Sequence, residues 1–249
     1  MKKFYVKDHP YIGSFLIGLL CTFLTALGAA VPQIIGLDSD GQMIVTTIFL
    51  MISIIIGIVI MKNSQFKLGD YGFRTREKGT ISKIWWYAPL VALEILPLAV
   101  VGFSSEITSV QYIILAFFTI AIGFNEEIYF RGLALKILEP KGKKRAILWS
   151  SIIFGVLHLI NVLNGKEPLY LVLQMIFAFL VGFVLAEIVS ITKSLWGVII
   201  WHAAHDYIAS ITGDALDAMA LIILAIQVGI LIIYGLCIWK ISKAEDTKK

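Results

Sequence analysis

The stretch "YIILAFFTIAIGFNEEIYFRGLALKI", residues 112–137, decides how this chain is expected to fold. It is long and apolar enough to cross a bilayer as one helix, because such a helix needs about 20 residues. Yet it contains two adjacent carboxylates, Glu126 and Glu127, and a guanidinium, Arg131. A charge near the bilayer centre costs about 2.5–3.5 kcal/mol on insertion scales, so these side chains should face the interior of a helical bundle. We therefore expect a polar site inside the membrane.

The composition of the whole chain agrees with a membrane location. Of its 249 residues, 59% are hydrophobic and only 15% are charged, whereas soluble domains carry about 25% charged residues. This predicts a multi-pass protein of the cell membrane, in contact with lipid, that forms one domain over residues 1–249. The formal charge of +4 gives no support for nucleic acid as a partner. Cys21 and Cys237 lie in apolar runs, so neither a disulfide nor a metal-binding pair is expected.

Eight apolar segments are candidates to span the membrane, and short connections with Gly, Pro, Ser or Asp separate most of them. The predicted fold class is therefore all-α, a bundle of about eight transmembrane helices with a motif-bearing core over about 109–212. The predicted spans are 11–36, 43–61, 84–104, 109–138, 146–164, 169–192, 194–212 and 218–241.

Lys and Arg predict the side of the membrane that each connection faces, because cytoplasmic loops carry an excess of both. With a cytoplasmic N-terminus, 19 of the 21 Lys and Arg residues fall in cytoplasmic segments. Lys166 lies in an external loop, and Arg131 lies inside the membrane. Both termini are therefore expected in the cytoplasm, and the basic connection 62–83 is expected to lie against anionic lipid.

Helical rise places four ionisable residues from three spans at a similar depth. At 1.5 Å per residue, the distances from the cytoplasmic helix ends are about 15 Å for Glu126, 18 Å for His158, 12 Å for His202 and 18 Å for Asp206. Charges that meet at one depth indicate a site rather than scattered helix contacts. Because this layer is slightly on the cytoplasmic side of the midplane, the site is expected to open towards the cytoplasm.

Spacing within the fourth span suggests different roles for its charges. Glu127 and Arg131 are four residues apart on one helix face, so they should neutralise each other as a structural clamp. Glu126 points about 100° away and has no cation nearby in the sequence, which makes it the candidate general base. His158, from the next span, could hold a water molecule together with Glu126.

Other polar residues in the spans receive weaker predictions. His202 and Asp206 are four residues apart, so the carboxylate could fix the tautomer and orientation of the imidazole. His205 is interpreted as a polar residue facing the bundle. Glu94 could line the same cavity, although a contact between helices is preferred. Glu187, about one turn from the end of its span, is expected to reach the membrane surface.

In their order and spacing, these residues resemble the CAAX protease and bacteriocin-processing (CPBP) family of intramembrane endopeptidases. The pattern of that family is EExxxR, then FxxxH, then HxxxN or HxxxD, each on its own membrane helix. This chain contains "EEIYFR" (126–131), "FGVLH" (154–158) and "HAAHD" (202–206), and "FRGLAL" at the first motif is also similar. The resemblance covers roughly residues 120–210.

The resemblance implies hydrolysis of a peptide bond in a membrane-associated protein or peptide, with no serine or cysteine nucleophile and no cofactor. Glu126 and His158 would activate a water, and His202 and Asp206 would stabilise the oxyanion. Glu127 and Arg131 would form a clamp that supports the site. Because an ionised Asp206 cannot donate a hydrogen bond, we prefer for it the role of orienting His202.

Three alternatives stay open. Glu, two His and Asp could bind Zn²⁺ and activate water at the metal, although no HExxH motif is present. The same carboxylates could belong to a transporter or proton relay, although no inverted repeat is seen. A member of the family could also be a membrane scaffold or regulator without catalytic activity. The substrate and the oligomeric state do not follow from the sequence.

Overall fold

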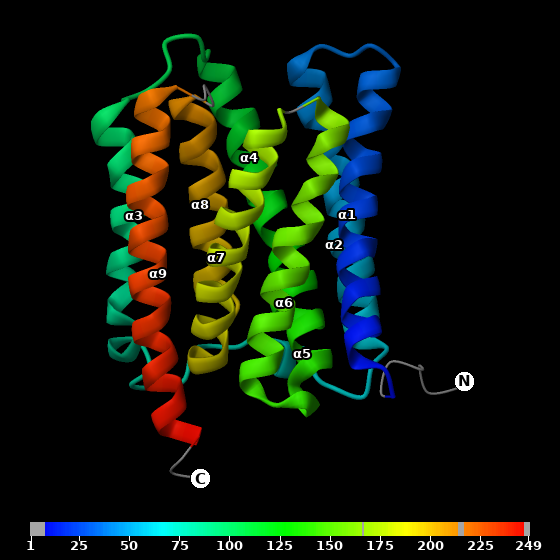
Figure 1. Ribbon diagram of the computed structural model, residues 1–249. Helices are drawn as coiled ribbons and strands as arrows, with labels where there is room; N and C mark the ends of the chain where they lie inside the picture. Colours follow the sequence, from blue (N-terminus) through cyan, green and yellow to red (C-terminus); the bar gives the residue numbers. More distant parts are fainter. Residues whose placement is uncertain (1–7, 166, 214–216, 247–249) are drawn as a thin grey trace.

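The computed structural model describes residues 8–165, 167–213 and 217–246, which form helices joined by short connections (Figure 1). All eight predicted spans are helical, and no strand occurs among the described residues, so the all-α class is confirmed. The α-helices are α1 Pro10–Ile34, α2 Ser39–Lys62, α3 Ala88–Val100, α4 Ser109–Glu127, α5 Leu135–Leu138, α6 Lys143–Leu157, α7 Pro168–Thr192, α8 Trp196–Thr212 and α9 Ala218–Asp246.

Several of the predicted spans differ from ideal transmembrane helices. Seven helical segments in the described part of the chain are long and apolar enough to cross a membrane. The helix outside that set is α8, which has only 17 residues and contains the polar motif HAAHD. The fourth predicted span runs without a break over Ser109–Lys141, but a π-helical segment, Ile128–Ala134, separates α4 from α5.

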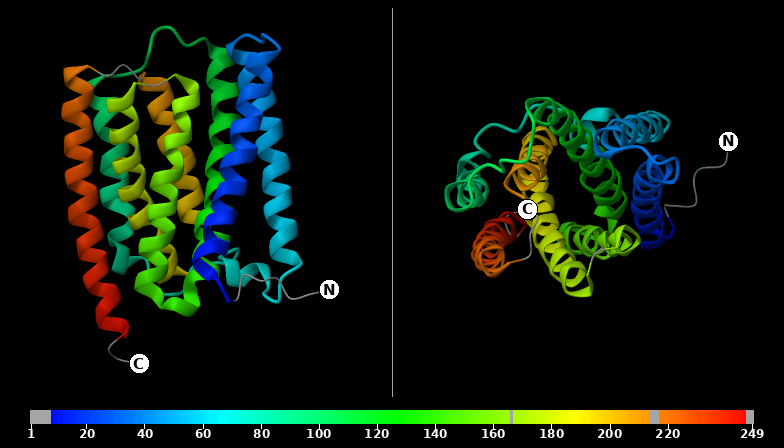
Figure 2. Two further views of the ribbon diagram at one scale, coloured as in Figure 1. Left: turned by 45° about the vertical axis from the view of Figure 1, so that its right-hand side comes forward. Right: turned by 90° about the horizontal axis from the view of Figure 1, so that it is seen from above.

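Four helices make up the centre of the bundle and two pairs form its edges. Seen from above, α1 and α2 lie at one edge and α3 and α9 at the opposite edge (Figure 2). Between them, α4 packs against α2 and α8, and α6 packs against α7. The central helices therefore carry all three motifs and are covered on both sides.

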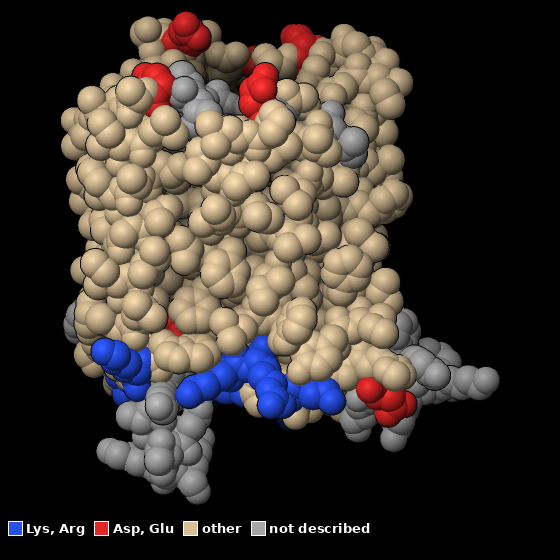
Figure 3. Space-filling model, in the orientation of Figure 1, with Lys and Arg blue, Asp and Glu red and all other residues tan. Residues whose placement is uncertain are grey.

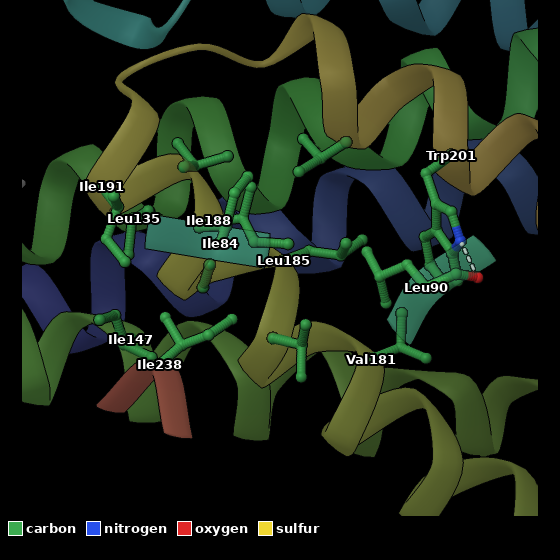
Figure 4. Close-up of a cluster of buried hydrophobic side chains, with 14 of the residues drawn as sticks. Ile84, Leu90, Leu135, Ile147, Val181, Leu185, Ile188, Ile191, Trp201 and Ile238 are labelled. Atoms are coloured by element: carbon green, nitrogen blue, oxygen red, sulfur yellow. Dashed lines mark hydrogen bonds between the residues drawn. The ribbon is translucent and has the colours of Figure 1, made fainter. Parts of the chain in front are cut away.

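Two clusters of buried apolar side chains hold the bundle together. One joins α7, α8 and α9 around Leu185, and in it Trp201 donates from Nε1 to the carbonyl oxygen of Leu90 at 3.0 Å (Figure 4). The other joins α1, α2 and the π segment around Tyr129, whose hydroxyl donates to the carbonyl oxygen of Ser53 at 2.9 Å. The site lies between these clusters, so its backbone is supported from both edges.

Helices α4 and α8 approach each other closely at Gly123. A Cβ atom at this position would lie 2.8 Å from the backbone nitrogen of Ala203 and 3.1 Å from the carbonyl oxygen of Ile199. Both are backbone atoms, so no side-chain rotation could make room. The missing side chain therefore lets the first motif, on α4, lie directly beside the third motif, on α8.

The two ends of the bundle differ in the charged residues that they carry (Figure 3). Except for Arg131, the described Lys and Arg residues lie in or next to the segments at the end where α1 begins and α9 ends, which we name the basic end. The opposite end, named the acidic end, has no Lys or Arg among the described residues and carries Asp38, Asp40, Glu106, Glu167 and Asp217. Lys166 and the lysines at 2, 3, 7, 248 and 249 lie outside the described residues. Which end faces the cytoplasm stays a prediction.

The connection between α2 and α3 closes the basic end below the site. The carbonyl oxygen of Gly72 accepts from the backbone N–H of Leu195 at 2.9 Å, and that of Arg74 accepts from Ser194 Oγ at 2.8 Å. Gly72 has φ +98°, and a Cβ atom there would lie 2.7 Å from Leu195 Cγ. Glycine is therefore needed, and the connection is fixed to the turn between α7 and α8.

Candidate active site

Glu126 and Glu127 end α4, and their carboxylates have different surroundings. The side chain of Glu127 is 0% exposed, whereas that of Glu126 is 18% exposed and lines two cavities. Only Glu126 can therefore meet a water molecule or a substrate without a rearrangement of the bundle. This agrees with the different directions expected for the two side chains from the sequence.

Glu127 joins two motifs through one oxygen atom. Its Oε1 lies 2.9 Å from Arg131 Nη1 and 2.7 Å from His202 Nδ1. The predicted contact between Glu127 and Arg131 is thus present, and both side chains are almost completely buried. The contact with His202 was not predicted, because it depends on the close approach of α4 and α8.

The orienting partner of His202 differs from the one predicted. Glu127 holds its Nδ1, so Nε2 is directed to the other side, where Glu126 Oε2 lies 3.6 Å away and Asp206 Oδ2 lies 3.8 Å away. Neither distance is that of a hydrogen bond. The prediction that Asp206 fixes the imidazole is therefore wrong, since the carboxylate that does so comes from α4.

His158 lies where α6 changes into a 3-10 segment, His158–Asn164. Its Nδ1 is 2.8 Å from the carbonyl oxygen of Phe154. A carbonyl oxygen only accepts, so Nδ1 carries the proton and Nε2 is left as an acceptor. The backbone of the FxxxH motif therefore sets the tautomer in which Nε2 can take part in water activation.

Phe154, the first residue of that motif, packs against side chains of all three motifs. Its ring centroid is 4.1 Å from Arg131 Cζ, 4.6 Å from the ring of His158 and 6.1 Å from the ring of His202. Gly182 on α7 leaves room for it, because a Cβ there would lie 3.1 Å from Phe154 Cδ1. Sequence reasoning gave Phe154 no role, although its place in the motif was visible.

The four candidate catalytic residues line one cavity of about 710 Å³. Glu126 enters it from α4, His158 from the end of α6, and His202 and Asp206 from α8. The rest of the lining comes from Asn161 and from parts of α1, α2, α4, α7, α8 and α9 that lie towards the acidic end, and it includes Thr46, Phe118, Tyr170, Gly213 and Leu224. The cavity therefore leads from the catalytic layer to the acidic end. If the basic end is cytoplasmic, the predicted opening towards the cytoplasm is wrong.

A smaller cavity of about 150 Å³ also reaches Glu126 and His158. Helix α1 lines most of it, with Thr22, Thr25 and several alanines, and neither His202 nor Asp206 takes part. No part in the site was predicted for α1, because it contains no Asp, Glu, His, Lys or Arg between Pro10 and Ile34.

A comparison with protein families found a match that covers the site. The model of the family "Type II CAAX prenyl endopeptidase Rce1-like" matches residues 108–208, which contain all three motifs. The resemblance to CAAX proteases is confirmed. The family is one of membrane proteases. Comparisons with curated proteins and with solved structures found no match.

Two further polar side chains meet beside the CAAX protease motifs. His205 lies between the rings of Trp201 and Phe177, at centroid distances of 5.1 and 5.4 Å. Its Nδ1 is 3.0 Å from Glu94 Oε1, so the pair joins α8 to α3, and the expected bundle-facing position of His205 and helix contact of Glu94 are both present. Glu187 is 0% exposed, and its oxygens have no hydrogen-bond partner among the described residues. Its expected reach to the membrane surface is wrong.

A metal-dependent variant of this chemistry would need a set of close ligands. Among the described residues, no group of three or more His, Cys, Asp and Glu side chains is arranged to hold a metal ion. A mechanism without a cofactor stays a prediction, because only the protein's metal content and its response to chelation test it.

Proposed function

We propose that the chain is a CPBP-type intramembrane endopeptidase of the cell membrane. Its substrate would be a membrane-associated protein or peptide. The observation that supports this is the convergence of Glu126, His158, His202 and Asp206 on one cavity of about 710 Å³. A cavity of this size can hold a short peptide segment, since ligand pockets commonly measure about 300–1,000 Å³.

In this proposal Glu126 is the general base. It takes a proton from a water molecule that also contacts His158 Nε2, and the water oxygen adds to the carbonyl carbon of the scissile bond. Collapse of the tetrahedral intermediate breaks the C–N bond. The proton held by Glu126 then passes to the leaving nitrogen, so the products are an amine and a carboxylic acid, whose remaining proton is released on ionisation.

His202 would stabilise the negative oxygen of the intermediate. It can donate from Nε2 when that atom carries a proton, and the contact of Nδ1 with Glu127 at 2.7 Å fixes the direction of the ring. Asp206, 3.8 Å from Nε2, would balance the charge of the protonated ring. Arg131, 2.9 Å from Glu127 Oε1, holds that side chain in place, which makes the buried pair a positioning device.

The proposal is tested by comparing the peptides released in membranes that contain the wild-type chain and the Glu126→Gln variant. The matched control is Glu106→Gln, an exposed carboxylate at the acidic end. Peptides that disappear in the first variant and remain in the control are the expected result. Identical peptide profiles for all three proteins, with Glu126→Gln folded, would contradict the proposal.

A further inference from the structure

The direction in which the cavity opens limits where a substrate can come from. Above the catalytic layer, the cavity is lined by the beginnings of α2, α7 and α9 and by the end of α8. All of these lie at the acidic end of the bundle (Figure 1). Its lining contains Ala209 and Ser210 of α8 and Gly213, which follows this helix, and all three are exposed. A path therefore leads from Glu126 to this end.

At the basic end, the described residues leave no comparable path to Glu126. Arg131 and Phe154, each about one turn nearer that end than Glu126 and His158, are buried. A cavity of about 200 Å³ lies at the basic end and is lined by Arg131, but by none of the four candidate catalytic residues. The connection between α2 and α3, fixed at Gly72, closes this end further.

The distribution of Lys and Arg assigns the two ends of the bundle to different sides of the membrane. Every described Lys and Arg outside the π segment belongs to the basic end, and an excess of these residues marks the cytoplasmic side. The acidic end then faces away from the cytoplasm. The cavity lining contains the carboxylates Glu126 and Asp206, three histidines and no Lys or Arg, so an acidic segment would meet two carboxylates and no permanent cation, and a neutral or positively charged segment fits better.

We propose that the substrate is a membrane-attached peptide segment, neutral or basic, that reaches Glu126 from the extracytoplasmic face. That the segment is a substrate rests on the proposed function, whereas the direction of access rests on the cavity and the charge distribution. A tail presented only from the cytoplasm would meet the closed basic end.

Labelling of single cysteines by a membrane-impermeant maleimide tests the direction of access without any activity. Ile122→Cys lies in the cavity wall one turn from Glu126, and Ile120→Cys, two residues earlier, is 50% exposed on the outside of the helix and should face lipid. In intact cells we expect the first to react from outside and the second to stay unlabelled. The parent chain gives the background of Cys21 and Cys237.

A cysteine at Lys141, at the basic end, should react only after the membrane is opened. Reaction of Ile122→Cys only after opening, or no reaction from either side, would overturn the proposal.

In a second arm, a basic reporter peptide carrying an acyl anchor is added to right-side-out and to inverted vesicles, and cleavage is expected only in the first. Cleavage only in inverted vesicles would also overturn it. The labelling result holds even where no cleavage is detected, so failure of the proposed function is recognised separately.

Discussion

Glu127→Gln should destabilise the protein much more than Glu126→Gln, although the two substitutions are chemically identical and adjacent. Glu127 Oε1 contacts both Arg131 Nη1 at 2.9 Å and His202 Nδ1 at 2.7 Å, in a setting without solvent. The glutamine keeps the volume and an acceptor oxygen but removes the negative charge. Arg131 then stays buried without a counter-charge, because a guanidinium does not lose its proton.

The size of the effect follows from the burial of the pair. Removing one partner of a buried ion pair costs about 3–5 kcal/mol. For a chain of this length, each kcal/mol lowers the unfolding midpoint by about 2–4 °C, so Glu127→Gln should lower it by at least about 6 °C. Glu126 is 18% exposed and 3.6 Å from His202 Nε2, a loose pair worth about 0–1 kcal/mol. Glu126→Gln should therefore lower the midpoint by about 4 °C at most.

Thermal unfolding of the purified variants in detergent is the measurement. The double variant Glu127→Gln with Arg131→Met is the internal control, because it removes both charges and keeps an apolar side chain against Phe154. It should recover at least about 1 kcal/mol relative to the sum of the single changes. Equal losses for Glu126→Gln and Glu127→Gln, or no recovery in the double variant, would refute the division between a buried clamp and an accessible base.

Three further predictions address the mechanism and the packing. Purified protein should contain well under one zinc per chain by elemental analysis, and a chelator should leave activity unchanged; stoichiometric zinc with activity restored by added metal would replace the mechanism proposed. Gly123→Ala should destabilise by about 1–3 kcal/mol, because its Cβ would meet the backbone of Ala203. Gly229→Ala, where nothing lies within 4 Å, should be neutral or stabilising in the same unfolding assay. Glu94→Leu should cost about 1–3 kcal/mol by leaving His205 Nδ1 without its acceptor, and an unchanged midpoint would show that water replaces the carboxylate.

The sequence was sufficient for the helices and for the depth of the site, because both follow from regular geometry along one chain. Eight apolar runs and a rise of 1.5 Å per residue bring Glu126, His158, His202 and Asp206 to one layer. The same four residues line one cavity in the structure. Nothing in that reasoning depended on how the helices pack.

Contacts between helices could not be predicted in the same way. The spacing of His202 and Asp206 suggested that they pair, but Glu127 takes the imidazole because Gly123 lets α4 come close to α8. The depth of a residue in the membrane also does not show which end of the bundle is closed by side chains and which end is open. For that reason the opening of the cavity was expected at the wrong end of the bundle. Glu187 lies near the end of its helix, yet neighbouring side chains cover it completely.

The π-helical segment Ile128–Ala134 has a consequence for the number of residues between the motifs. A π turn accommodates an additional residue compared with the α-helix around it. Deleting one residue from this segment would let it wind as a regular α-helix, with everything after it close to its present phase. A deletion in the regular part of α4 would instead rotate everything after it by about 100° and turn Arg131 and Leu135 away from their neighbours. The π turn therefore takes up one residue without a change in the phase of the helix, and a relative one residue shorter here could keep that phase with regular winding.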